Sequence, residues 1–371
     1  MSVPVIVVSS ESVSAAAKAI LLIAASGEPT RTAAVIPERS PQLAKASELR
    51  VVRTRPKELR LGEGCSCCTV RGDLLDRIRK LARNGSTERI IVHATPDDDL
   101  EVLAKTFTVA DRDGAVLDRE ASLESLVTAV GIDDLDQNRS PRALVERIEL
   151  ATVVLLDGPG AGTDERARAA GIVGALNPDA RITWTDTVPD ALAVGQAAGD
   201  PRFDPDAARQ RGALGDVLRG ADRRSASGVS QFVFSARRPF HPTRLRDWLG
   251  SCPAGILRAR GTYWVASQPD VAATLDVAMG DVAIQVQGTW WAAVPAAQHP
   301  AGPEWEAYRA RVWHPTFGDR RQHITLITSD LDETVMRTAL QDCLVTEAEI
   351  GQWGARAASP GSPPSTGAES R

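Results

Sequence analysis

Three of the five cysteines of this chain, Cys65, Cys67 and Cys68, lie within four residues of one another. A disulfide between two of them would close a very small, strained ring and would leave the third thiol over. Three thiolates at positions i, i+2 and i+3 can instead meet at one metal ion if the backbone turns. Zinc and Cu(I) favour sulfur ligands, and zinc takes four ligands in a tetrahedron. The segment therefore predicts a zinc site whose fourth ligand is a carboxylate, a histidine, water or a group from a partner.

Two other interpretations of the thiol cluster stay open. The thiols can be buried and inert, or they can form a redox sensor, which would respond to oxidation and would hold no metal after purification. The remaining cysteines, Cys252 and Cys343, stand alone in apolar segments. We expect both of them to be core residues.

Length and charge set the frame for any function. A chain of 371 residues suits two domains with a core each, and a net charge of −5 gives no overall attraction to nucleic acid or anionic membranes, although a local basic patch can still exist. No apolar run reaches the length of a membrane span, and the N-terminus lacks the features of a signal peptide. We therefore expect a cytoplasmic protein, and a reducing compartment agrees with clustered free thiols.

The elements that must position the cysteines alternate along the first half of the chain. From residue 4 to about residue 190, short β-branched runs alternate with segments of helical period, which predicts a mostly parallel sheet covered on both faces. The expected strands are 5–8, 33–36, 90–93, 126–130 and 152–156, and the expected helices are 12–25, 71–84, 98–107, 141–148 and 164–175.

The composition and the hydrophobic pattern of the sequence change three times, which predicts four parts. Residues 1–195 form the α/β domain, and residues 196–229, rich in Asp, Pro, Gly, Arg and Ser, form a linker. Residues 230–355 mix strands with helices in an α+β pattern, and the Pro-rich residues 356–371 form a disordered tail.

The loop after the first strand decides whether such a sheet binds nucleotides, because ligands bind at the carboxyl ends of the strands. A phosphate loop needs glycines followed by Lys and Ser/Thr. Residues 9–18 read Ser-Ser-Glu-Ser-Val-Ser-Ala-Ala-Ala-Lys and contain neither feature. Glu11 would place a negative charge where a phosphate should lie, and Ser9 and Ser10 are predicted to act only as helix caps.

The segment Gly64–Leu75 reads Gly-Cys-Ser-Cys-Cys-Thr-Val-Arg-Gly-Asp-Leu-Leu. It resembles the Cys-X-Cys-Cys-Thr-Val-Arg-Gly-Asp-Leu segment of the CobW-like GTPases. These are zinc-associated P-loop proteins of the metallochaperone type. Four stretches of the second half, 232–242, 255–261, 289–293 and 315–322, resemble the C-terminal domain of that family. The resemblance covers nearly the whole chain. It implies a P-loop-NTPase-like parallel sheet followed by a smaller α+β CobW C-terminal domain.

The departures from the family pattern concern the nucleotide. The family's Gly-Lys-Thr falls on Ala15–Ala17, its acidic motif after the third predicted strand is replaced by His93–Asp98, and its guanine-reading Asn-Lys-X-Asp is replaced by Asp157–Gly160. The phosphate, metal-linked and base-recognition elements are therefore changed together. Against the resemblance, these residues predict a P-loop that is lost, a pseudo-GTPase without catalytic residues, and no binding of GTP.

One further match concerns the metal. Glu38 falls where the family has a glutamate after its second strand, so the resemblance makes it the preferred fourth ligand beside Cys65, Cys67 and Cys68. The alternative is that Glu38 is an ordinary acidic residue of an exposed loop. His93 competes for the same role, and its alternative is a histidine satisfied within the core or a loop.

Within the family, the chain resembles those mycobacterial members that recruit a ribosome hibernation factor to the ribosome when zinc is scarce. This resemblance implies a zinc-responsive, non-enzymatic factor that acts on the 30S subunit, and a GTP-dependent zinc metallochaperone is the alternative. A face for rRNA or a ribosomal protein is expected from arginines near the aromatic residues Trp248, Tyr263 and Trp264, unless these arginines only solvate the surface around core aromatics. The arginines are Arg237, Arg238, Arg244, Arg246, Arg258 and Arg260.

Overall fold

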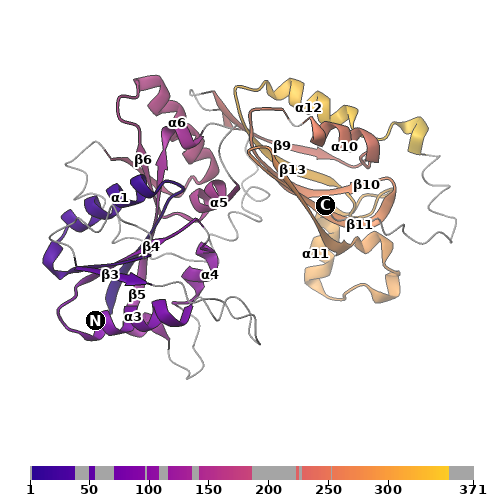
Figure 1. The fold of residues 1–371 in the computed structure, drawn as a ribbon. Coiled ribbons are helices and arrows are strands. Elements are labelled where there is room, and N and C mark those ends of the chain that lie inside the picture. The colour runs from indigo at the N-terminus through magenta and orange to yellow at the C-terminus, as the bar shows by residue number, and fades with distance from the viewer. Residues whose placement is uncertain are drawn as a thin grey trace, which may run out of the picture. The chain divides into compact units, whose positions relative to one another are not determined.

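A seven-stranded parallel sheet organises the first of the two units into which the chain divides, Met1–Ser230 and Gln231–Arg371 (Figure 1). The structure is a computed structural model. It describes residues 2–37, 50–54, 71–96, 98–107, 116–135, 142–185, 223–224, 228–251 and 253–350.

The strands of the first sheet lie in the order β3-β2-β4-β1-β5-β6-β7, and every pairing between neighbours is parallel. Residues alternate between the two faces of a strand, so a strand that is buried on both faces is apolar throughout. In β1, Ile6 and Val8 pack on one face and Val5 and Val7 on the other, all of them buried. The strands are β1 (Val3–Ser9), β2 (Thr32–Pro37), β3 (Arg50–Thr54), β4 (Arg89–Ala94), β5 (Ala121–Gly131), β6 (Val153–Asp157) and β7 (Arg181–Trp184).

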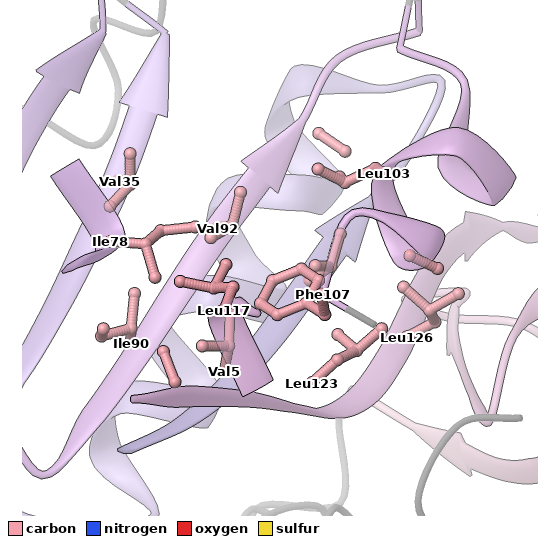
Figure 2. Packing of buried hydrophobic residues seen from close by; sticks show 14 of the residues in the cluster. Val5, Val35, Ile78, Ile90, Val92, Leu103, Phe107, Leu117, Leu123 and Leu126 are labelled. Atoms are coloured by element: carbon pink, nitrogen blue, oxygen red, sulfur yellow. The ribbon is translucent and has the colours of Figure 1, made fainter. Parts of the chain in front are cut away.

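Helices cover both faces of this sheet. On one face, α1 (Val13–Ala25) buries Ile20 and Ile23 against the strands. On the other face, α3 (Arg71–Arg83) and α4 (Leu100–Lys105) pack with Phe107 and Leu117 over β1, β4 and β5 (Figure 2). The chain continues through α5 (Arg142–Leu150) after β5 and α6 (Thr163–Leu176) after β6.

The sequence predicted five of these strands and all five of these helices to within a few residues, and the structure confirms them. It did not predict β3 and β7, which are the two edge strands. Both begin with arginine and are only five and four residues long. Short edge strands with charged residues lack the apolar run that marks the interior strands.

The second sheet is antiparallel and has its strands in the order β12-β11-β10-β13-β9-β8. All of it except β8 and the start of β9 belongs to the second unit. Its core joins the strands to Leu245 and Trp248 of α10 and to Met336 and Leu340 of α12. The elements are β8 (Arg223–Arg224), β9 (Val229–Ala236), α10 (Pro242–Gly250), β10 (Ile256–Val265), β11 (Gln268–Ala278), β12 (Asp281–Thr289), α11 (Pro303–Val312), β13 (Gln322–Ser329) and α12 (Glu333–Asp342).

The predicted fold class, a parallel α/β sheet followed by a smaller α+β domain, is confirmed. Most of the predicted linker 196–229 and the whole predicted tail 356–371 lie outside the described residues, and the described part of the linker range includes β8. Among the helices of the described ranges, none combines the length and the apolar character that a membrane crossing requires.

Candidate functional site

The carboxyl ends of β1, β4, β5, β6 and β7 meet at one edge of the first sheet, which is where a fold of this kind binds its ligand. The loop that follows β1 is the first part of this edge. Ser10 Oγ donates a hydrogen bond to the carbonyl of Ala129 at 2.7 Å, and Ser9 Oγ lies 3.2 Å from Thr128 Oγ1. Both serines are buried and attach the loop to β5.

The helix cap is a correction to the sequence analysis. Ser9 and Ser10 were predicted to cap α1, but the N-cap residue is Ser12, whose Oγ accepts from the backbone N–H of Ala15. The helix begins at Val13, one residue after the predicted start. Ser9 and Ser10 bind β5 instead, and Ser10 Oγ also accepts from the backbone N–H of Ser12 at 3.1 Å. Ala15, Ala16 and Ala17 lie in the first turns of α1 and are buried against the core.

Glu11, the acidic residue of this loop, has a cationic partner from a distant helix. Arg147 of α5 lies with Nε 3.1 Å from Glu11 Oε1, and the side chains are 4% and 19% exposed. The two atoms form an ion pair without hydrogen-bond alignment. A carboxylate at this depth needs a compensating charge, because water cannot solvate it fully. Arg147 supplies that charge from within the protein.

The same arginine holds the loop after β4. Its Nη2 donates to the carbonyls of Thr95, Pro96 and Asp98 at 2.9, 2.8 and 3.2 Å. The carboxylate of Asp98 in turn accepts from the backbone N–H and the hydroxyl of Thr95. One buried guanidinium therefore fixes the loops after β1 and β4, the two loops that would carry phosphate and metal in a nucleotide site.

A second ion pair lies at the ends of β6 and β7. Lys18 of α1 places Nζ 2.5 Å from Oδ1 of Asp157, and Thr185 Oγ1 donates to the same oxygen at 2.5 Å. Asp157 is the first residue of the segment where the family resemblance places its base-reading motif. The side chains of Lys18, Asp157 and Thr185 are therefore joined by an ion pair and a hydrogen bond within the protein.

Gly158, the next residue of that segment, is needed for close packing. A Cβ built on it would lie 2.0 Å from Cδ1 of Ile132, the residue that follows β5. The loop after β6 therefore packs directly on the end of β5.

His93, the competing metal ligand, lies at the end of β4 and is buried. Burial lowers the pKa of His93, with a smaller lowering by the Arg147 charge, and Asp98 opposes both effects. The imidazole is therefore neutral at neutral pH, the form that can bind a metal. His93 pairs with Val8 of β1 in the sheet, so it lies at the edge described above.

The predicted zinc ligands Cys65, Cys67, Cys68 and Glu38 lie outside the described residues. The described strands fix where their segments leave the sheet. Glu38 follows Pro37, which pairs with Thr54 at the end of β3, and the cysteine segment falls between β3 and α3. Three thiolates and a carboxylate suit zinc by their chemistry. Within the described ranges, no group of three or more His, Cys, Asp and Glu residues is placed to hold a metal.

The arginine face expected in the second unit needs correction at Arg258. Arg258 and Arg260 of β10 both bind Asp276 of β11, with closest distances of 2.5 and 2.6 Å, and Arg258 is buried. The two guanidinium groups share the single carboxylate of Asp276, and Arg258 is buried, so Arg258 is not available to an external partner. The aromatic residues expected beside them, Trp248, Tyr263 and Trp264, are buried as well.

Of the other four arginines, two follow β9 directly and two lie on α10. Arg237 donates to the carbonyl of Val312 at 2.8 Å and Arg238 to that of Val345 at 3.1 Å, so both brace loops. Arg244 forms an ion pair with Glu349 at 2.7 Å. Arg246 is the most exposed of the four, and its Nε lies 3.6 Å from Asp247. Arg237, Arg238 and Arg244 therefore already hold contacts within the second unit.

Arg147 and Lys18 are the residues of the site that the sequence did not single out. One signal was present for Arg147: it lies beside the buried residues Leu144, Val145 and Ile148 of α5, where a helix of this length places its core face. A second signal was Glu11 itself, because a carboxylate in an otherwise neutral loop is stabilised by a nearby cation. The pairing itself could not be predicted, because the partners are far apart in the chain.

Comparisons with known proteins agree with this two-part architecture. Residues 19–183 match the family described as CobW/HypB/UreG, nucleotide-binding domain, and residues 229–344 match the cobalamin synthesis protein cobW C-terminal domain. Zinc-regulated GTPase metalloprotein activator 1 of Dictyostelium discoideum is 25% identical over 339 residues, which cover 82% of this chain and 70% of that protein. A zinc chaperone of Mycobacterium tuberculosis is 29% identical over 319 residues, which cover 80% and 77%. A zinc-bound YjiA GTPase from E. coli is 15% identical, with a TM-score of 0.35 over 93% of this chain and 100% of that chain.

Proposed function

We propose that this chain is a zinc-responsive member of the CobW/HypB/UreG family that acts as a binding factor without GTP. Its first part matches the nucleotide-binding domain of that family, and its second part matches the CobW C-terminal domain, so the chain belongs to that family. The observation that carries this proposal is the Glu11–Arg147 ion pair at the edge of the sheet. In a nucleotide-binding domain, these loops hold the phosphates. Here they contain a carboxylate, that of Glu11, with Arg147 as its counter-ion.

Three further observations support the loss of GTP binding. Residues 9–18 contain no glycine that would let phosphate approach the backbone. The match to the nucleotide-binding family begins at residue 19, beyond this loop. At the ends of β6 and β7, Lys18 and Thr185 bind Asp157, the residue that begins the altered base-reading segment.

The zinc part of the proposal depends on the cysteine segment and on the relatives. Cys65, Cys67 and Cys68 supply three thiolates, and Glu38 is the proposed fourth ligand. Two relatives are named a zinc chaperone and a zinc-regulated GTPase metalloprotein activator. Zinc can act as a signal only if it binds one state of the protein better than another.

The finer proposal is that the protein, in the cytoplasm, recruits a ribosome hibernation factor to the 30S subunit when zinc is depleted. It rests on the resemblance of the sequence to mycobacterial members of the family. The contact surface then differs from the arginine face first expected, since Arg258 is buried in an ion pair.

Nucleotide binding is the decisive test of the first part. Isothermal titration with GTP and GDP in the presence of Mg²⁺ should show no binding at concentrations up to ~1 mM, a level that corresponds to a very weak interaction. Micromolar affinity would contradict the proposal. It would favour the second candidate, a GTP-dependent zinc chaperone, which the names of the two relatives favour.

The zinc site is tested separately with Co²⁺ as a spectroscopic probe for zinc. The wild-type protein should show thiolate-to-cobalt charge transfer that zinc removes, and the variant with Cys67→Ala and Cys68→Ala should not. Cys343→Ala is the matched control and should behave as the wild type, because Cys343 is buried in the second unit. An unchanged spectrum in the double variant would exclude the proposed ligands.

Recruitment is tested by sedimentation of the protein and a purified hibernation factor with ribosomal subunits through a sucrose gradient, with and without a zinc chelator. Recruitment predicts that the factor moves with the 30S subunit in the presence of the protein and that chelation increases this fraction. If neither protein sediments with the subunit in either condition, the ribosomal part of the proposal is wrong.

A further inference from the structure

The strand β12 forms one edge of the antiparallel sheet in the second unit. In the order of that sheet it pairs with β11 on one side, and no other strand of the described residues lies on its second side. It is nine residues long, longer than either edge strand of the first sheet. An edge of this kind presents backbone donors and acceptors that can pair with another strand.

The side chains of β12 make this edge apolar on one face. Ile284 is 53% exposed and Val286 is 72% exposed, and both lie on the same face as Val282, which packs partly on the core. Their partners across the β11–β12 pairing are Leu275 and Ala273 of that core. The apolar face of the sheet therefore continues from β11 to the edge strand.

Lysine and proline, two of the usual protections of an edge strand, are absent from β12, and its bulge lies only toward its C-terminal end. Natural edges carry lysine, proline or inward-facing charges that prevent pairing. The strand Asp281–Thr289 has one charged residue, Asp281 at its start, and no proline. A bulge interrupts the pairing near Gln287, since Val286 lies opposite Ala273 and Gly288 opposite Ala272. The regular part of the edge is therefore 281–286.

We propose that β12 pairs in antiparallel fashion with β12 of a second copy of this chain, around a two-fold axis at Ile284. In this register Ile284 faces its own equivalent, and Val282 faces Val286 of the second copy, so six apolar side chains meet on one face of the joined sheets. The residues paired in this register, 282–286, carry no charge, so no like charges meet. A two-fold interface must be self-complementary, and this register meets that condition.

A single pair of strands buries less surface than a standard permanent interface. The dimer is therefore reversible and depends on protein concentration. This pairing would also withdraw the β12 edges of both copies from further pairing, so the β12 interface joins two copies and no more.

Sedimentation equilibrium of the full-length protein over a range of concentrations tests the interface. The wild-type mass should rise from 39.6 kDa toward twice that value, and Ile284→Lys should keep the protein monomeric. Val335→Lys is the matched control, because Val335 is 65% exposed on α12 and lies away from the edge. It should dimerise as the wild type does. A monomeric wild type at all concentrations, or a dimer that Ile284→Lys leaves unchanged, would overturn the proposal.

The register is tested by oxidative cross-linking, with the linked peptides identified by mass spectrometry. Directly opposite residues of antiparallel strands have Cα atoms ~4.5–5.5 Å apart, within the range of a disulfide. Ile284→Cys should therefore link to its equivalent in the second copy. Val286→Cys should not, because the axis separates its two copies by four residues along the strand. Equal self-linking by both variants, or linking by Val286→Cys alone, would contradict the axis at Ile284.

Discussion

Arg147 shows how one side chain can connect two loops at the edge of a parallel sheet. It is buried, it compensates the charge of Glu11, and it binds three carbonyls of the loop after β4. In a nucleotide-binding relative of this fold, phosphate and a metal ion would connect these loops. Here the connection is a permanent part of the chain, so we expect the edge to be ordered without any ligand.

Arg147→Ala tests this role. It leaves Glu11 without its counter-ion and removes the donor to three carbonyls, so we expect the first unit to lose roughly 2–4 kcal/mol of stability, somewhat less than a fully buried pair because Glu11 is 19% exposed. Hydrogen exchange at the backbone amides of Thr95 and Asp98 should become faster in the same variant. Urea unfolding and exchange mass spectrometry measure the two effects.

The control for this prediction is Arg83→Ala. Arg83 also binds a carboxylate, that of Glu120 at 2.6 Å, but the pair lies at the surface and its arginine is well exposed. Surface ion pairs contribute little to stability. Equal losses in Arg83→Ala and Arg147→Ala would show that burial of Arg147 has no special role.

The thiol of Cys343 should react only slowly with alkylating reagents, in contrast to the thiol cluster. Burial raises the pKa of the Cys343 thiol to about 11, so at pH 8 it stays protonated, and its reactivity should increase only as the pH rises toward that value. Native protein treated with iodoacetamide at pH 8 should therefore be modified at Cys343 far more slowly than protein unfolded in urea. Rapid modification of the native protein, measured by mass spectrometry, would contradict the burial.

At the scale of elements, Gly261 allows β10 and β13 to pair closely. It lies opposite Ile324, and a Cβ built on it would lie 2.0 Å from the carbonyl oxygen of His323. Gly261→Ala must therefore separate the two central strands, and we expect the second unit to lose about 2–3 kcal/mol of stability, as for other overpacked positions. Denaturant unfolding measures this loss.

Gly250 provides the comparison for the same substitution. It is the last residue of α10, and no atom lies within 4 Å of a Cβ built on it. Because alanine favours helix more than glycine does, Gly250→Ala should leave the stability unchanged or raise it slightly. A similar loss in both variants would mean that the contact at His323 does not decide the outcome.

Elements of the first unit were predictable where burial repeats along the sequence. Interior strands such as β1 and β4 contain apolar runs, and α1 follows β1 with a helical period, so the pattern of residues predicted each of them. The edge strand β3 carries arginine at Arg50 and Arg53 and could not be distinguished from a loop. Its place follows only from pairing with β2.

The site was predictable only in part, for a related reason. The sequence showed what residues 9–18 lack and identified Glu11 as unfavourable for phosphate, because these properties belong to a single segment. It did not predict Arg147, and it wrongly placed Arg258 on an exposed face, because both depend on contacts between segments. Local composition does not determine which distant charge compensates a buried one.

At the scale of the whole molecule, the two units each have a hydrophobic core of their own. The clusters around Ile20 and Phe107 belong to the first unit, and the cluster around Phe232 and Leu340 belongs to the second. Cooperative unfolding follows the core that holds a unit together, and proteins with more than one domain depart from a single two-state transition. We therefore expect two transitions in differential scanning calorimetry.

The two destabilising variants assign these transitions. Arg147→Ala should lower one midpoint by several degrees and leave the other in place, and Gly261→Ala should do the reverse, since each residue contacts the core of one unit only among the described residues. Calorimetry of a variant with both substitutions should show the two shifts together, because independent sites add. A single transition that either substitution lowers would instead show that the two units unfold as one. A ligand that binds and stabilises the first unit would then also stabilise the second.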